Sequence, residues 1–179
     1  MSKPFDYNQA FDRINFRQEP ERYQVGKGEQ GVLSVEPYKS EILPHWRFKT
    51  PEVARQSAEH IYDMFKTYQQ ADDFVGMDMA RKFLQMGYTR SRRYANHKSG
   101  RKYSTEDKLD QPVDIPPTPP YKTAANREHH VKSRTKKVLP LDPDPEKAES
   151  AEIFYDFYTR ANTDESYRAL RAAHKELYG

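Results

Sequence analysis

The chain carries a long run of cationic side chains with no acid among them. From Arg81 to Tyr103 there are eight Lys or Arg residues and no Asp or Glu. Such side chains bind phosphates by charge-assisted hydrogen bonds and by releasing counterions. The run therefore predicts a surface that binds RNA, DNA or another phosphorylated polyanion. Its candidate contacts are Arg90, Arg92, Arg93, Tyr94, His97, Lys98, Arg101 and Lys102.

The spacing within this run suggests how it would be presented. Tyrosines lie between the cations, and Tyr94 is the ring that we expect to stack on an unpaired base. If residues 90–98 form a short helix, Arg90, Arg93 and His97 share one face. A preceding helix that ends at Gly87 would make the arrangement similar to a helix-turn-helix. The alternative is one long helix through Gly87, which costs about 1 kcal/mol for a glycine inside a helix.

Charge elsewhere in the chain leaves a second interpretation open. Residues 121–138 form another basic cluster, whereas residues 142–179 hold nine acids and five bases, a net charge of 5 − 9 = −4. The basic segment could therefore pair with the acidic C-terminal helices of the same chain or of another copy. The protein would then be a structural adaptor, and a homo-oligomer is one form that such pairing would take.

A second constellation, around His45, Trp46 and Arg47, could support catalysis or bind a small anion. Residues 44–50 alternate as a strand does, which places His45, Arg47 and Lys49 on one face and two aromatic rings on the other. A histidine can act as an acid or base, and an arginine can hold an anionic substrate. No nucleophile or carboxylate stands at a diagnostic spacing, so the sequence favours a binding protein over an enzyme. These three cations could also extend the polyanion-binding surface.

The segment 26–31 matches the pattern G-x-G-x-x-G. A dinucleotide site needs a helix directly after these glycines, but the strand-like sequence GVLSVE follows here. We therefore expect a tight turn between two strands, and a phosphate-binding backbone nest is the alternative. The six histidines form no helical metal-binding pair, and we expect neither a metal site nor a cofactor.

The elements that must position these residues form a mainly helical α+β fold. Segments 22–25, 31–36 and 44–50 resemble strands and predict a small antiparallel sheet packed on helical hairpins. Helical periodicity predicts a helix over 51–70, begun by Thr50 and Pro51, and a second over 73–86. Residues 142–179 predict two more helices, the second starting near Thr163.

Composition sets the domain organisation. Hydrophobic residues make up 35% of the 179 residues, and aromatic residues 13%. We expect one compact domain made of 1–103 and 142–179, with 104–141 as a flexible, proline-rich basic arm. The absence of cysteine excludes a disulfide scaffold and cysteine-ligated metals. With no apolar run of about 18–20 residues and no signal peptide, we expect a soluble cytoplasmic protein without a membrane partner.

Three long blocks resemble a known family. They are VGKGEQGVLSVEPYKSEILPHWRFKTPE (25–52), DDFVGMDMARKFLQMGYTRSRRYANHKSGRKY (72–103) and LPLDPDPEKAESAEIF (139–154). These blocks are similar to those of a family of domains of unknown function, DUF4385, and the resemblance covers about three quarters of the chain. It implies one compact domain that joins residues 1–103 to the C-terminal helices. It brings no activity and no catalytic residues, and the stretch 111–137 departs from it.

Overall fold

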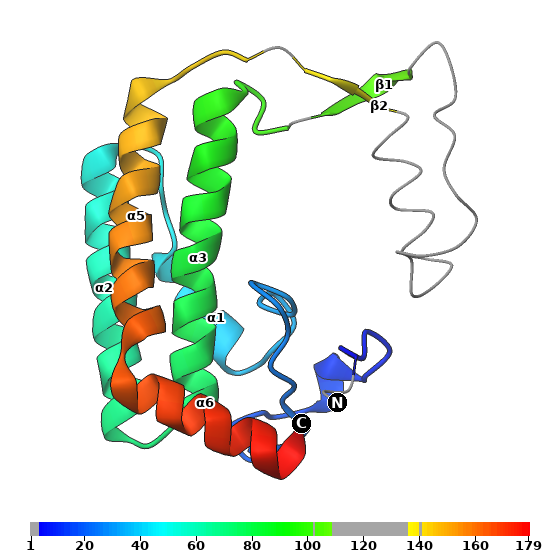
Figure 1. Cartoon of the computed structure of the whole chain (residues 1–179), viewed down its shortest axis with the longest axis vertical. Helices are drawn as coiled ribbons and strands as arrows, with labels where there is room; N and C mark the ends of the chain where they lie inside the picture. Colours follow the sequence, from blue (N-terminus) through cyan, green and yellow to red (C-terminus); the bar gives the residue numbers. More distant parts are fainter. Residues whose placement is uncertain (1–3, 102, 109–135, 140) are drawn as a thin grey trace. The chain divides into compact units, whose positions relative to one another are not determined.

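The computed structural model of the chain describes residues 4–101, 103–108, 136–139 and 141–179 (Figure 1). These residues divide into two compact units, which we describe separately. The larger unit comprises Met1–Arg92 with Pro145–Gly179, and the smaller unit comprises Arg93–Asp144. Five α-helices are present in the described residues: α1 (Tyr38–Ile42), α2 (Pro51–Gln70), α3 (Phe74–Asn96), α5 (Pro145–Thr163) and α6 (Glu165–Tyr178).

Helix α2 has the range that its sequence predicts. The hydroxyl of Thr50 accepts a hydrogen bond from the backbone N–H of Val53 at 3.3 Å, and Pro51 occupies the first turn. These features satisfy and pre-organise the start of a helix. The helix buries one stripe of side chains, which includes Ile61 and Phe65. Its local signals and its tertiary packing therefore agree.

Helix α3 continues through Gly87, so the predicted turn and the similarity to a helix-turn-helix are wrong. A Cβ atom on Gly87 would lie 2.3 Å from the ring of Phe154 in α5. Gly76 likewise faces the ring of Tyr68 in α2, where a Cβ would lie 2.5 Å away. Both glycines allow a neighbouring helix to bring an aromatic ring against the α3 backbone. Close packing here outweighs the weak intrinsic helix preference of glycine.

The larger unit is a bundle in which α2, α3 and α5 stand side by side and α6 crosses one end (Figure 1). Helices α2 and α5 run in the same direction, and α3 runs opposite to them. The carboxylate of Asp164 caps α6 by accepting from the N–H of Tyr167 at 2.8 Å. The two predicted C-terminal helices are thus confirmed. The core contains large rings, among them Phe16, Tyr38, Phe65, Phe83, Phe154 and Tyr167.

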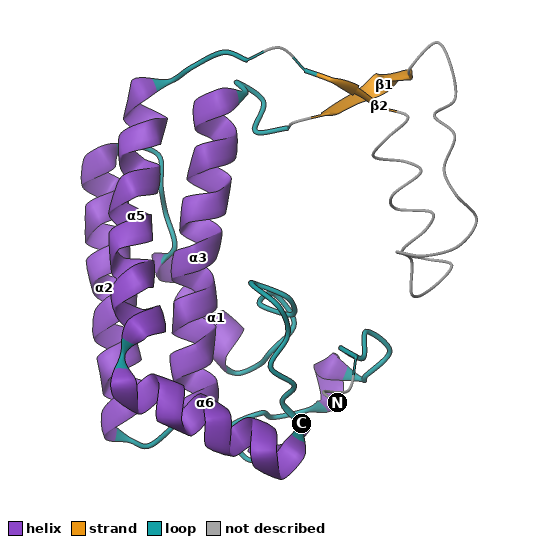
Figure 2. Cartoon of the chain, viewed as in Figure 1, coloured by secondary structure: helices purple, strands orange, loops and turns teal. Residues whose placement is uncertain are grey.

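The predicted sheet over residues 22–50 is wrong, and with it the α+β class. This stretch contains turns, the short helix α1 and the 3-10 turn η3 (Leu43–His45) (Figure 2). Two more 3-10 turns come before it, η1 (Phe11–Arg13) and η2 (Pro20–Arg22), and η2 ends at its first residue. Its β-branched residues reach the helical core from these turns, because Val32 and Val35 are buried. Gly28 and Gly31 adopt positive φ, which breaks an extended backbone. The larger unit is therefore helical, with no strand among its described residues.

The smaller unit contains the end of α3 and a pair of antiparallel strands. β1 (Tyr103–Lys108) pairs with β2 (Lys136–Val138), with Tyr103 opposite Val138. The amides of Asp142 and Asp144 donate to the carbonyls of Asn96 and Ala95, both at 2.8 Å, and so satisfy the end of α3. Most of the predicted arm 104–141 lies outside the described residues, and the domain boundary stays a prediction. None of the helices in the described ranges is long and apolar enough to cross a membrane.

Candidate functional site

The first part of the cationic run is buried inside the helical unit. Asp78 lies one turn of α3 before the adjacent pair Arg81 and Lys82. The side chains are buried: Asp78 and Lys82 are 0% exposed, and Arg81 is 4% exposed. The carboxylate of Asp78 is 2.9 Å from the guanidinium of Arg81 and 3.6 Å from the ammonium of Lys82. Their spacing along the chain is that of ordinary ion pairs on a helix surface. The structure instead makes these three residues an internal charge cluster.

Two tyrosine hydroxyls complete the coordination of Asp78. Tyr23 and Tyr167 both donate to its carboxylate, Tyr167 at 2.6 Å. Burial alone would raise the pKa of Asp78, but the two cations and the two hydroxyls hold that pKa well below its usual range. Burial lowers the pKa of Lys82, and the attraction of Asp78 offsets only part of this effect. Asp78 therefore stays ionised while Lys82 loses stability as a cation.

The glycine-rich segment covers this cluster with backbone oxygens. The carbonyl of Gln30 accepts from Lys82 Nζ at 2.8 Å, and the carbonyl of Gly28 accepts from Arg81 at 3.2 Å. A phosphate nest would present N–H groups instead. The glycines do form turns, as expected, but these turns do not join two strands. The segment 26–31 thus serves as a set of acceptors for two buried cations.

The later part of the cationic run lies on the surface. The exposed members are Arg90, Arg92, Arg93, Lys98 and Arg101, and Lys102 lies outside the described residues. At 100° per residue, the three arginines of α3 spread over an arc of about 160°, with Thr89 and Asn96 between them. No acid stands on this arc. Among the residues that the structure describes, these five cations form no ion pair.

Tyr94 and His97, the other two candidate contacts of the run, are less exposed than its five surface cations. His97 is only 6% exposed and follows the end of α3, so it does not share an exposed face with Arg90 and Arg93. Tyr94 is half-buried, and its ring lies so close to Gly100 that a Cβ there would be 2.6 Å away. This contact covers part of the ring that was expected to stack on a base.

A different set of rings is available on the outer side of α3 and α5. Tyr88 and Tyr155 have ring centroids 5.0 Å apart, and Tyr158 is 6.2 Å from Tyr155. Tyr155 is 51% exposed. Tyr88 and Arg92 are separated by one helical turn, so they share a side of α3. The tyrosine pair at positions 155 and 158, spaced as helix neighbours, is the signal that could have revealed this cluster.

The segment around His45 alternates as predicted, although it is not a strand. His45, Arg47 and Lys49 are exposed, while Trp46 and Phe48 are half-buried against the core. Ser57 holds the segment on α2, because its hydroxyl donates to the His45 carbonyl at 2.7 Å and accepts from the Arg47 amide at 2.9 Å. Trp46 packs on Phe83, whereas the glycine turn contacts α3 at Arg81 and Lys82.

His45 has one neighbour that the sequence did not indicate. Its ring stacks on that of His60 in α2, with centroids 4.0 Å apart. Partial burial, together with the positive charges of His60 and Arg47, lowers the pKa of His45. The lowered pKa favours the neutral form of the His45 ring at neutral pH. Among the described residues, no group of three metal-ligating side chains is present.

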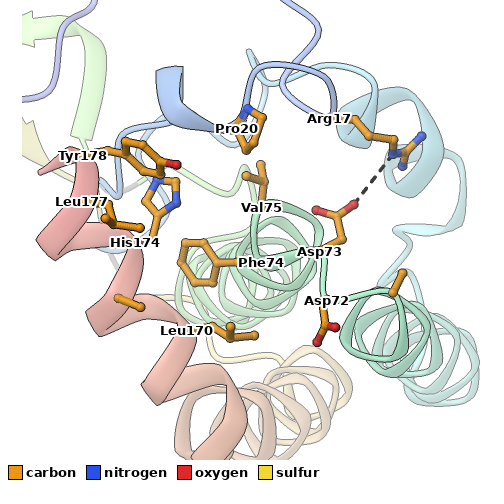
Figure 3. Close-up of a pocket in the computed structure, with 12 residues that line it drawn as sticks. Arg17, Pro20, Asp72, Asp73, Phe74, Val75, Leu170, His174, Leu177 and Tyr178 are labelled. Carbon is orange, nitrogen blue, oxygen red and sulfur yellow. Dashed lines mark ion pairs between the residues drawn. The ribbon is translucent and has the colours of Figure 1, made fainter.

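A hollow of about 510 Å³ opens where α6 meets the start of α3 (Figure 3). Several of its polar groups have partners: Tyr38 donates to Asp73 at 2.7 Å, and Arg17 lies 3.7 Å from the same carboxylate. His174, on the α6 side, donates from Nε2 to the carbonyl of Tyr23 at 2.7 Å. These contacts hold the N-terminal segment against α6 and α3. No motif in the sequence pointed to this hollow.

Comparison with known proteins agrees with the resemblance of the three sequence blocks. No curated protein and no solved structure matches the chain. The family model described as "Domain of unknown function (DUF4385)" matches residues 6–177. This range includes both the internal charge cluster and the exposed arginines of α3. The chain therefore belongs to the DUF4385 family.

Proposed function

We propose that this protein binds nucleic acid, with the exposed arginines of α3 as phosphate contacts. The observation that carries the proposal is the acid-free arc of Arg90, Arg92 and Arg93, which form no ion pair among the described residues. Arginine presents a planar fork of donors that suits phosphate oxygens. Lys98 and Arg101, which follow α3 in the chain, would add contacts. His45, Arg47 and Lys49 remain a proposed extension of this surface.

The ion pairs of three other arginines support this proposal. Arg17 forms a two-bond pair with Glu41 at 2.7 Å, and Arg160 pairs with Asp156 at 2.8 Å. Arg81 is neutralised inside the protein by Asp78. Each of these three arginines thus has a carboxylate partner. In the part of the chain that the structure describes, the three arginines of α3 have none, which leaves their guanidinium groups available to a ligand.

The exposed ring of Tyr155 favours single-stranded over duplex nucleic acid. Rings that stack on unpaired bases contribute about 1–3 kcal/mol per base. Tyr155 is the most exposed ring of its cluster, and Tyr88 lies beside it one turn from Arg92. An unpaired base on Tyr155 would place its phosphates toward the arginine arc. Glu152, one turn from Tyr155 on α5, would oppose such a ligand by charge.

Salt dependence of binding tests the phosphate contacts. We expect the full-length protein to bind a fluorescent single-stranded RNA or DNA, measured by anisotropy across a salt series. For single strands the logarithmic salt slope is about 0.7 per phosphate contact, so replacing the three arginines by glutamine should flatten it by about 2. Arg160→Gln, on the surface of α5, is the matched control and should leave the slope unchanged. A flat salt response of the wild-type protein would overturn the proposal.

Stacking has its own test. Tyr155→Ala should weaken binding by about 1–3 kcal/mol while the salt slope stays the same, and Tyr155→Phe should bind nearly as the wild type does. Glu152→Gln should strengthen binding, because it removes an acid that lies one helical turn from Tyr155. Equal affinity of Tyr155→Ala and wild type would remove the tyrosine cluster from the proposed surface.

A further inference from the structure

We propose that α6 forms a separate binding site for a small molecule that carries two adjacent phosphates, through Arg168, Arg171 and Lys175. These residues line a hollow of about 390 Å³ together with Asn162, Tyr167 and Ala172. Three of its six lining residues are cations and none is an acid. Glu165 and Glu176 also belong to α6, but they do not line the hollow.

The helix itself places the three cations in one row. Positions 168, 171 and 175 follow the spacing of one helical face. The other side of α6, with Leu170 and His174, faces the hollow of Figure 3. At 1.5 Å per residue the row is about 10 Å long, which suits two linked phosphate groups and their hydration better than a single anion. The volume lies within the range of about 300–1,000 Å³ that is usual for small-molecule sites.

The hydrogen-bond donors of these three side chains do not all have acceptors in the described part of the chain. Nε of Arg171 is covered from solvent and has no hydrogen-bond partner in the described part of the chain. Arg168 donates from Nε to the Asn162 carbonyl at 3.2 Å, which fixes its guanidinium at the turn between α5 and α6. Buried donors without partners are uncommon, because each loses its hydration without gaining a hydrogen bond. An anion in the hollow would supply the missing acceptor.

Charge behind the hollow also favours an anion. Arg171 lies close enough to the internal charge cluster for its positive charge to disfavour the cationic form of Lys82. That cluster has two cations, Arg81 and Lys82, around the carboxylate of Asp78. A phosphate group beside Arg171 would relieve this repulsion. The inference does not depend on the proposed nucleic-acid surface, since it rests on different residues of a different helix.

Titration of the full-length protein with inorganic pyrophosphate tests this site. Calorimetry gives the affinity, and the arginine Nε–Hε signals in NMR spectra report which side chain is engaged. We expect the Arg171 signal to shift on binding, and Arg171→Gln to weaken binding at least tenfold. Arg168→Gln and Lys175→Gln should each weaken it less. Arg55→Gln, on the exposed side of α2, is the control and should bind as the wild type does.

Two further measurements distinguish this site from the nucleic-acid surface and a loss of binding from a loss of folding. The variant that lacks Arg90, Arg92 and Arg93 should keep its affinity for pyrophosphate, which distinguishes this site from the nucleic-acid surface. Arg171→Gln should fold with unchanged or higher thermal stability, because it removes a charge that repels Lys82. The proposal is overturned if pyrophosphate does not bind, if sulfate at equal ionic strength competes as well as pyrophosphate, or if Arg171→Gln binds with wild-type affinity.

Discussion

Replacing Asp78 by asparagine should strongly destabilise the protein, because it removes the only carboxylate bonded to Arg81 and Lys82 in the described structure. The two separations, 2.9 Å and 3.6 Å, correspond to gross attractions of about 6 and 5 kcal/mol at an effective dielectric constant of about 20. Desolvation of the ions cancels much of this attraction. Removing one partner of a buried pair typically costs about 3–5 kcal/mol, and we expect a loss of this size.

Urea unfolding at neutral pH measures this loss directly. Asp156→Asn is the matched control, because its partner Arg160 lies on the surface and such pairs contribute about 0–1 kcal/mol. A double-mutant cycle with Lys82→Met sharpens the test. Asp78→Asn should cost less in the Lys82→Met background, because only one buried cation is then left without its carboxylate. Equal stability of Asp78→Asn and wild type would refute the charge cluster as described.

The pH dependence of stability gives a second measure of the same cluster. The pKa of Asp78 is lowered in the folded protein from its ordinary value of 3.8. Its contribution to stability is therefore complete above that value and is lost as the pH falls further. The wild-type protein should lose stability in this acidic range more steeply than Asp78→Asn does. Parallel curves for the two proteins would contradict the assignment.

Two more predictions concern packing and the His45 segment. Gly87→Ala should lower the free energy of unfolding by about 1–3 kcal/mol, since the added methyl group would overlap the ring of Phe154. In a protein that already carries Phe154→Leu, Gly87→Ala should cost less. Urea unfolding of the two single variants and the double variant checks this. In NMR titrations the pKa of His45 should lie below 6.5, because of partial burial and the charges of His60 and Arg47. Arg47→Gln should raise that pKa, and an unchanged value would exclude the repulsion.

Helices with strong local signals could be predicted from sequence, and those that depend on tertiary packing could not. Helix α2 begins at Pro51 as its cap and proline indicate. The end of α3 was misplaced because glycine inside a helix is unfavourable in isolation. What permits Gly87 is the ring of Phe154, a residue far away in the chain. No local pattern contains that information.

The sheet was predicted for a related reason. The valines of segments 22–25 and 31–36 have the composition of strands, and their burial is real, since Val32 and Val35 are in the core. Burial and composition do not determine backbone pairing, however. The carbonyls of this region bind the cations of α3 instead of a neighbouring strand. The propensity for strands was overridden by tertiary contacts.

The exposure of the cationic run was predicted in part. Arg90, Arg92 and Arg93 lie on the surface as expected, but the run also included Arg81 and Lys82, which are internal. The motif Asp78-x-x-Arg81-Lys82 has the spacing of an ordinary surface ion pair. Its burial depends on two tyrosines that lie 55 and 89 residues away from Asp78. The cations of α6 were not singled out, because the acidic balance of the C-terminal region concealed them.

The convergence of two distant segments on Asp78 has a consequence for how the chain folds. Tyr23 precedes the helices of the bundle in the chain, and Tyr167 belongs to the last helix, α6. Both hydroxyls must reach Asp78 before its carboxylate has all its hydrogen bonds. Two long loops therefore have to close around a centre that stays hydrated until they do. Helical proteins usually fold fast because their contacts are local, and this one should fold more slowly than its helix content suggests. The same arrangement makes both ends of the chain part of one cooperative unit, so that truncating either end exposes the charges at its centre.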